Sequence, residues 1–155
     1  MSDATVIPPI EELVPQRGTM LLLDRVTAFT AETASAEYTP RSGAWYADEA
    51  GNMPAWIGIE LMAQTVAAHV ALIKCDDGLP PRLGALLGTR RYHSAVPAFA
   101  AGVALRIEVA MAFRDASGLG AYECAIRLGA ATLASATLKV YEPEDFNTFV
   151  QGSSQ

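Results

Sequence analysis

One acidic residue, Glu60, lies in the middle of a strongly apolar segment that runs from Met53 to Lys74. Its strongly polar side chains are Glu60, Gln64, Thr65 and His69. A segment that is apolar on every side is typical of a buried helix. A lone carboxylate in such a helix costs several kcal/mol unless it is paired, hydrogen-bonded or protonated. Glu60 is therefore the first candidate for proton-transfer chemistry.

Glu60 also has a structural interpretation, as a buried acid that pairs with Arg17 or Arg25. Acids with perturbed environments concentrate in functional clefts, which favours a chemical role. Gln64 follows at position i+4, so it either hydrogen-bonds and orients Glu60 or is purely structural. His69, two turns past Glu60, is predicted on a helix face or at a dimer contact, with no catalytic role.

The composition predicts one domain that associates with a partner. The chain has 155 residues, of which 51% are hydrophobic and 18% are charged. We predict a single domain over residues 1–142, followed by a polar tail over 143–155. The apolar excess indicates that a partner covers some of the surface, and a homodimer is the simplest partner.

Several classes of protein are disfavoured by charge and patterning. A net charge of −6 argues against nucleic-acid binding. The apolar helix approaches the length of a membrane span, but polar side chains interrupt its interior. The N-terminal residues include acids and prolines where a signal peptide would be basic and then apolar, so the chain is predicted to be cytoplasmic. Cys75 and Cys124 lack the spacing of a metal site, and no metal is expected.

Strands are predicted on both sides of the helix. The segment Leu21–Phe29 is predicted as a first strand, and the polar alternation over Thr30–Thr39 as an exposed second strand. Beyond the helix, apolar residues alternate over Leu105–Phe113 and again over Tyr122–Leu128, and a last strand is predicted over 132–141. One long helix and an antiparallel meander define an α+β fold in which the sheet curls around the helix.

Two motifs carry a family resemblance. VPQRGTMLLLDRV (Val14–Val26) and MPAWIGIELMAQ (Met53–Gln64) resemble the beta-hydroxyacyl-[acyl carrier protein] dehydratases of fatty acid synthesis. A weaker similarity covers GTRRYHSAVPAFAAG (Gly88–Gly102). The resemblance implies a hotdog fold, a curled antiparallel β-sheet wrapped around one long central α-helix. It also implies dimers joined edge to edge, with sites at the subunit boundary.

The resemblance assigns roles to individual residues. Glu60 takes the place of the family's catalytic acid, whereas Tyr46 stands at the position of its catalytic histidine. Gln16 replaces a histidine of the first motif. Ala55 replaces a glycine whose backbone N–H polarises the thioester carbonyl, and alanine retains that N–H. The implied substrate-binding residues are Met53, Pro54, Ala55, Trp56 and Gln64, with Trp56 walling the acyl pocket.

Dehydration requires a base for the α proton and an acid for the departing hydroxyl. We expect Glu60 to act with either Tyr46 or His93 as the second group. A tyrosine hydroxyl can donate a proton but is a weak base. His93 lies beside Arg90 and Arg91 and also fits a solvated strand position.

The basic pair Arg90–Arg91 has two interpretations. It is either an ordinary exposed patch or a docking site for an acidic acyl carrier protein and the phosphodiester of its phosphopantetheine arm. No phosphate-binding loop or nucleophile elbow is present in the sequence. No cofactor is expected beyond the carrier of the substrate, either this phosphopantetheine or coenzyme A.

Three functions remain open from the sequence. The resemblance favours a dehydratase that acts on acyl thioesters in fatty acid or polyketide/polyene-type synthesis. A hotdog acyl thioesterase that uses Glu60 is the first alternative, because it needs no histidine. The second alternative is a non-catalytic acyl-binding subunit that partners an active dehydratase in a heterodimer. A homodimer or a higher oligomer fits the two enzymatic functions, dehydratase and thioesterase.

Overall fold

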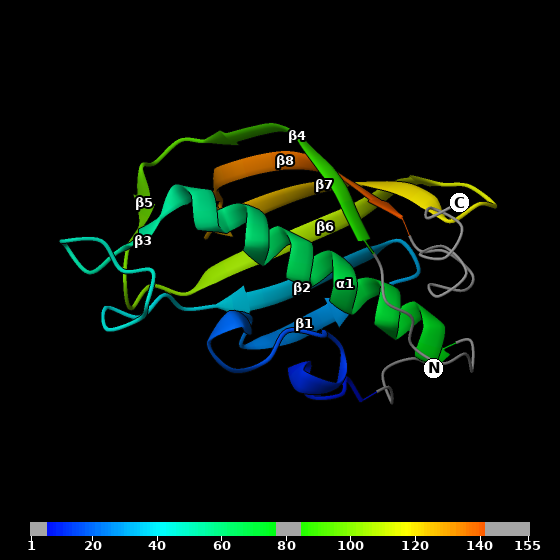
Figure 1. The fold of residues 1–155 in the computed structure, drawn as a ribbon, viewed down its shortest axis with the longest axis horizontal. Helices are drawn as coiled ribbons and strands as arrows, with labels where there is room; N and C mark the ends of the chain where they lie inside the picture. Colours follow the sequence, from blue (N-terminus) through cyan, green and yellow to red (C-terminus); the bar gives the residue numbers. More distant parts are fainter. Residues whose placement is uncertain (1–5, 77–84, 142–155) are drawn as a thin grey trace, which may run out of the picture.

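The fold is one long helix packed on a curled antiparallel sheet (Figure 1). The structure, a computed structural model, describes residues 6–76 and 85–141. The predicted hotdog architecture of class α+β is confirmed. The predicted polar tail over 143–155 lies outside the described residues.

The main sheet has six strands in the order β1-β2-β6-β7-β8-β4. Every neighbouring pair is antiparallel. The strands are β1 (Arg25–Phe29), β2 (Thr33–Tyr38), β4 (Ala85–Ser94), β6 (Leu105–Arg114), β7 (Leu119–Leu128) and β8 (Ala131–Tyr141). A two-stranded sheet joins β3 (Met53–Pro54) to β5 (Ala98–Phe99).

The central helix α1 (Gly58–Asp76) lies across the sheet, as Figure 1 shows. Its buried apolar side chains include Leu61, Met62, Val66 and Leu72. The segment Ala55–Cys75 is long and apolar enough to cross a membrane, yet 61% of its most apolar window is buried inside the fold. The same composition therefore suits a core helix, which is the position it has here.

The helix begins later than the sequence predicted. Met53 and Pro54 pair with Phe99 and Ala98 in the small sheet, and a 3₁₀ turn, η4 (Ala55–Ile57), precedes α1. Gly58 permits a close approach at this point, because a Cβ there would lie 2.5 Å from the Tyr92 hydroxyl oxygen. Backbone pairing with β5 thus takes the first two residues from the predicted helix.

The first two strands also differ from their predictions. The first strand begins at Arg25 and not at Leu21, because the backbone N–H groups of Leu22 and Leu23 donate to a helix side chain and not to a neighbouring strand. The second strand is not exposed as predicted. Its Ala34 and Ala36 side chains are buried, since β2 lies between β1 and β6 with one face toward the helix.

His69 is a core residue, which corrects the prediction of a helix-face or dimer-contact position. Its side chain has no exposed surface, and its Nε2 lies 2.9 Å from the carbonyl oxygen of Thr30. A carbonyl only accepts, so Nε2 carries the hydrogen and Nδ1 accepts from the Tyr122 hydroxyl at 2.9 Å. Burial lowers the pKa of His69, because the interior disfavours the charged imidazolium.

The stability of the fold is expected to fall as the pH drops below about 6.5, the ordinary pKa of histidine in an unfolded chain. At such pH, His69 binds a proton in the unfolded chain but not in the folded protein, where its pKa is lowered, so acid favours unfolding. Urea unfolding at about pH 7 and about pH 5.5, on either side of the histidine titration, measures how the free energy of unfolding changes with pH.

The chain has two histidines, which supplies a matched control. His69→Gln is expected to flatten the pH dependence of the free energy of unfolding, and His93→Gln, the same substitution at an exposed position, is the control. Equal slopes in the wild type and in His69→Gln would contradict the assignment.

Candidate active site

Glu60 lies in the first turn of α1, where two amide groups hold its half-buried carboxylate. The carboxylate oxygen Oε2 accepts from Gln64 Nε2 at 2.9 Å and from Gln16 Nε2 at 3.3 Å. The other oxygen, Oε1, accepts from none of the described residues and is not closed off from solvent. Oε1 is therefore the carboxylate oxygen that has no hydrogen-bond donor among the described residues.

The Gln64 amide, which is fully buried, uses all of its hydrogen-bonding capacity. Its Nε2 donates to the carbonyl of Met20 at 2.7 Å as well as to Glu60. Its Oε1 accepts the backbone N–H groups of Leu22 at 3.0 Å and Leu23 at 3.3 Å. These partners fix which end of the amide faces Glu60. The predicted contact between Gln64 and Glu60 is present, and Gln64 is a structural residue as well.

The arginines considered as partners for Glu60 are engaged elsewhere. Arg17 donates to the backbone carbonyls of Val14 and Gln16. Arg25 forms an ion pair with Glu37 at 2.7 Å across β1 and β2. Within the described part of the chain, the side chains hydrogen-bonded to Glu60 are thus neutral amides and not cations.

Gln16 is a contact that the sequence did not reveal. It comes from the segment between two 3₁₀ turns, η2 (Ile10–Glu12) and η3 (Gly18–Met20), and it lies 44 positions from Glu60 in the chain. The only sequence signal for this contact is that Gln16 stands at the position of a histidine in the family that the chain resembles. The Gln16 oxygen Oε1 is buried without a hydrogen-bond partner among the described residues.

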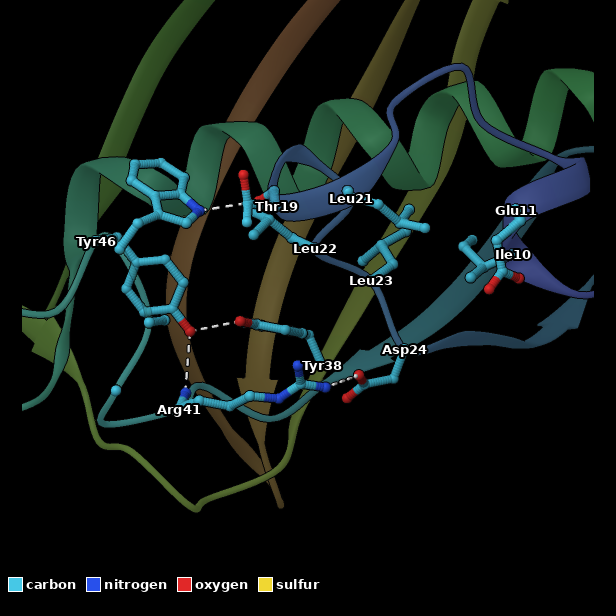
Figure 2. Close-up of a pocket in the computed structure, with 14 residues that line it drawn as sticks. Ile10, Glu11, Thr19, Leu21, Leu22, Leu23, Asp24, Tyr38, Arg41 and Tyr46 are labelled. Carbon is cyan, nitrogen blue, oxygen red and sulfur yellow. Dashed lines mark hydrogen bonds and ion pairs between the residues drawn. The ribbon is translucent and has the colours of Figure 1, made fainter.

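Tyr46, one candidate for the second catalytic group, turns its hydroxyl away from the helix (Figure 2). The ring is buried, with 6% of the residue exposed. Its hydroxyl is hydrogen-bonded to the hydroxyl of Tyr38 and accepts the Arg41 backbone N–H at 3.0 Å. The structure therefore forms no hydrogen bond between Tyr46 and Glu60.

His93, the other candidate, is exposed on β4, opposite Ser135 of β8. Its position follows an irregularity in the pairing of β4 with β8, where Arg91 has a positive φ of 57°. Among the described residues, His93 makes no hydrogen bond to Glu60. Among the described residues, neither predicted second group is therefore hydrogen-bonded to Glu60.

The backbone N–H of Ala55, which is predicted to polarise a thioester carbonyl, has a hydrogen-bond partner within the chain. It donates to the carbonyl of Pro97 at 3.0 Å, in continuation of the pairing between β3 and β5. The carbonyl of Ala55 accepts the Tyr92 hydroxyl. Met53 and Pro54 act as strand residues of this turn, so these positions shape the helix entrance.

Trp56 does not wall a buried pocket in the single chain, because 65% of it is exposed. It lies in the 3₁₀ turn η4, four positions before Glu60 in the chain. Trp45 and Met20 are also exposed, at 52% and 51%, and Met20 provides the carbonyl that holds Gln64. Exposed apolar side chains of this size indicate a surface that a partner or substrate covers.

Arg90 and Arg91 are exposed on β4, the last strand at one edge of the main sheet. Their predicted docking of a carrier protein stays a prediction. In the described part of the chain, no group of three or more His, Cys, Asp or Glu side chains could hold a metal ion.

A separate hollow of about 650 Å³ lies beside the Tyr38–Tyr46 pair (Figure 2). Its walls come from the N-terminal segment, the end of β2 and the loop that follows β2. Glu60 does not line it. The accessible oxygen of Glu60 and this hollow are thus two separate candidate sites.

The fold and the oriented acid define a protein of the hotdog class. A family model described as ApeP-like, ApeP dehydratase, matches residues 8–151. The chain belongs to this ApeP-like dehydratase family. Among curated protein sequences, no significant match is found.

Solved structures show the same fold. A chain of the dehydratase heterocomplex ApeI:P from Xenorhabdus doucetiae matches with a TM-score of 0.87 and 24% identity, covering 96% of this chain and 99% of that chain. The conserved protein PA5202 from Pseudomonas aeruginosa matches with a TM-score of 0.67 and 16% identity, covering 87% and 99%. A hypothetical thioesterase with coenzyme A from Streptococcus pneumoniae TIGR4 matches with a TM-score of 0.61 and 11% identity, covering 76% and 84%.

Gln64→Leu is expected to lower the free energy of unfolding by about 2–4 kcal/mol, because it leaves the buried backbone N–H groups of Leu22 and Leu23 without an acceptor and removes the donor to the carbonyl of Met20. Gln16→Leu, which removes one long hydrogen bond and an unpartnered oxygen, is the control, with a loss below about 1 kcal/mol. Urea unfolding of both variants measures the difference, and equal losses would show that Gln64 does not anchor this segment.

Proposed function

We propose that this chain is the acid-bearing subunit of a dehydratase for β-hydroxyacyl thioesters, in which Glu60 protonates the departing hydroxyl. The observation that carries the proposal is the arrangement at Glu60. Its Oε2 is occupied by two amide donors and its Oε1 is accessible. Membership of a dehydratase family supports the reaction class.

The base is supplied by a second hotdog subunit. Within the described chain, Tyr46 and His93 form no hydrogen bond to Glu60, and the Tyr46 hydroxyl is already engaged. A solved relative is a dehydratase heterocomplex of two components, which supports a heterodimer over a homodimer. The exposed Trp56 beside Glu60 supplies apolar surface for such a partner.

In the proposed reaction, the partner's base removes the α proton, the C–O bond at the β carbon breaks, and a C=C bond forms between the α and β carbons. The departing hydroxyl takes the proton from Glu60 Oε1 and leaves as water. Gln64 keeps the carboxyl group oriented, because its own amide cannot turn.

The substrate is a thioester carried by the phosphopantetheine of an acyl carrier protein, or by coenzyme A, in fatty acid or polyketide/polyene-type synthesis in the cytoplasm. Arg90 and Arg91 are the proposed docking positions for an acidic carrier protein, because both are exposed cations on an edge strand. No other cofactor is proposed.

A thioesterase is the second candidate, and the accessible Oε1 of Glu60 favours it because a carboxylate alone can activate water. The two reactions differ in product, since dehydration yields an enoyl thioester and hydrolysis yields a free acid. If neither product forms, the chain is a non-catalytic acyl-binding subunit.

Glu60→Gln, assayed in complex with a histidine-bearing hotdog subunit, is expected to lower enoyl formation by about 100-fold or more, because the general acid is lost. Mass spectrometry of β-hydroxyacyl thioesters on an acyl carrier protein measures both products. His93→Gln is the control and is expected to retain the rate within about threefold. Unchanged turnover in Glu60→Gln would refute the proposed role of the acid, and free acid as the product would favour the thioesterase.

A further inference from the structure

The hollow beside Tyr38 and Tyr46 contains a hydrogen-bond donor that the protein does not use. Tyr46 accepts the backbone N–H of Arg41 at 3.0 Å, so this N–H occupies one lone pair of the phenol oxygen. The two phenols share one hydrogen bond, and either oxygen can be its donor. Two phenol hydrogens are present and only one is used. In the described residues, the other hydrogen has no acceptor.

Both phenols are positioned to offer that hydrogen to a ligand. Tyr38 and Tyr46 are buried, with 3% and 6% of each residue exposed, and both line the hollow. Burial raises the pKa of Tyr38, and the hydrogen bond with Tyr46 adds to the effect, so this phenol stays protonated. The lining of the hollow therefore includes a neutral hydrogen-bond donor.

The walls and the rim define the rest of the ligand. Leu21, Trp45 and Ile10 give the hollow apolar walls. At the rim, Arg41 and Asp24 form an ion pair at 3.3 Å, which cancels the two charges. The exposed carboxylate of Glu11 also lines the hollow, so an anionic ligand is disfavoured there.

We propose that this hollow binds an uncharged acyl or aryl molecule that carries one carbonyl oxygen, with that oxygen accepting the spare phenol hydrogen. The volume of about 650 Å³ lies within the range of small-molecule sites. Small-molecule sites combine apolar walls with a few polar groups that fix the orientation of the ligand, and the two buried phenols would have that role here. The site is distinct from Glu60 and stands whether or not the chain is a dehydratase.

The bound molecule would contact the segment that anchors Gln64. The carbonyl of Thr19 in this segment accepts the indole N–H of Trp45 at 2.9 Å, on the side of the hollow. The next carbonyl, that of Met20, accepts from Gln64. Trp45 is thereby both a wall of the site and a fluorescent reporter of its occupancy.

Acetophenone and ethylbenzene test the proposal, because they share a shape and differ in the carbonyl oxygen. The chain has two tryptophans, so Trp56→Phe leaves Trp45 as the only indole. Titration of this protein with acetophenone is expected to give a saturable change in Trp45 fluorescence. Ethylbenzene is expected to bind about tenfold more weakly, because it cannot accept the hydrogen bond.

Tyrosine variants sharpen the test, because either phenol alone retains a free hydrogen. Tyr38→Phe leaves the Tyr46 hydrogen free, and Tyr46→Phe leaves that of Tyr38 free. Each single variant is expected to bind acetophenone within about threefold of the parent, whereas the double variant loses about tenfold. Circular dichroism verifies that the variants are folded.

The proposal would be overturned by any of three results: no saturable binding, equal binding of the two probes, or an undiminished affinity in the double variant. Glu60→Gln is expected to leave acetophenone binding unchanged, and a loss of binding there would place the probe at Glu60 and not in the hollow. A failure of dehydration in the enzyme assay leaves this result untouched.

Discussion

The amide of Gln64 is the interaction on which the site depends. It ties the extended segment after η3 to the helix through three backbone groups, and it uses its last hydrogen to hold Glu60. The segment would otherwise bury backbone polar groups without partners, which is costly in a low-dielectric interior. The Gln64 side chain therefore both holds the N-terminal segment and orients the acid.

This requirement explains why the acid sits on a helix that is otherwise apolar. The sheet curls around α1, whose buried side chains include Leu61 and Met62, while the carboxylate of Glu60 in its first turn is half-buried. A rigid element with one accessible carboxylate oxygen suits proton transfer. The companion groups of the same chain are directed elsewhere, since the hydroxyl of Tyr46 is engaged by Tyr38 and Arg41. Within the described residues, the hydrogen bonds to Glu60 come from Gln16 and Gln64.

The sequence predicted the features that depend on local periodicity. The apolar helix, the alternating strands and the i+4 contact between Gln64 and Glu60 all follow from short-range patterns. Contacts between distant residues do not follow from such patterns. The Ala55 N–H is taken by Pro97, and the N–H groups of Leu22 and Leu23 by Gln64, which no periodicity reveals. The pairing of strands and the packing of loops decide these contacts.

The proposed role of Glu60 requires a base from another subunit. This requirement can be measured as the rate of enoyl formation while a histidine-bearing hotdog subunit is titrated into a fixed amount of this chain. Negligible activity is expected without the partner, followed by a rise that saturates at equal amounts, with no rise for Glu60→Gln. Full activity of this chain alone, or a saturating rise that survives Glu60→Gln, would show that Glu60 does not act in this way.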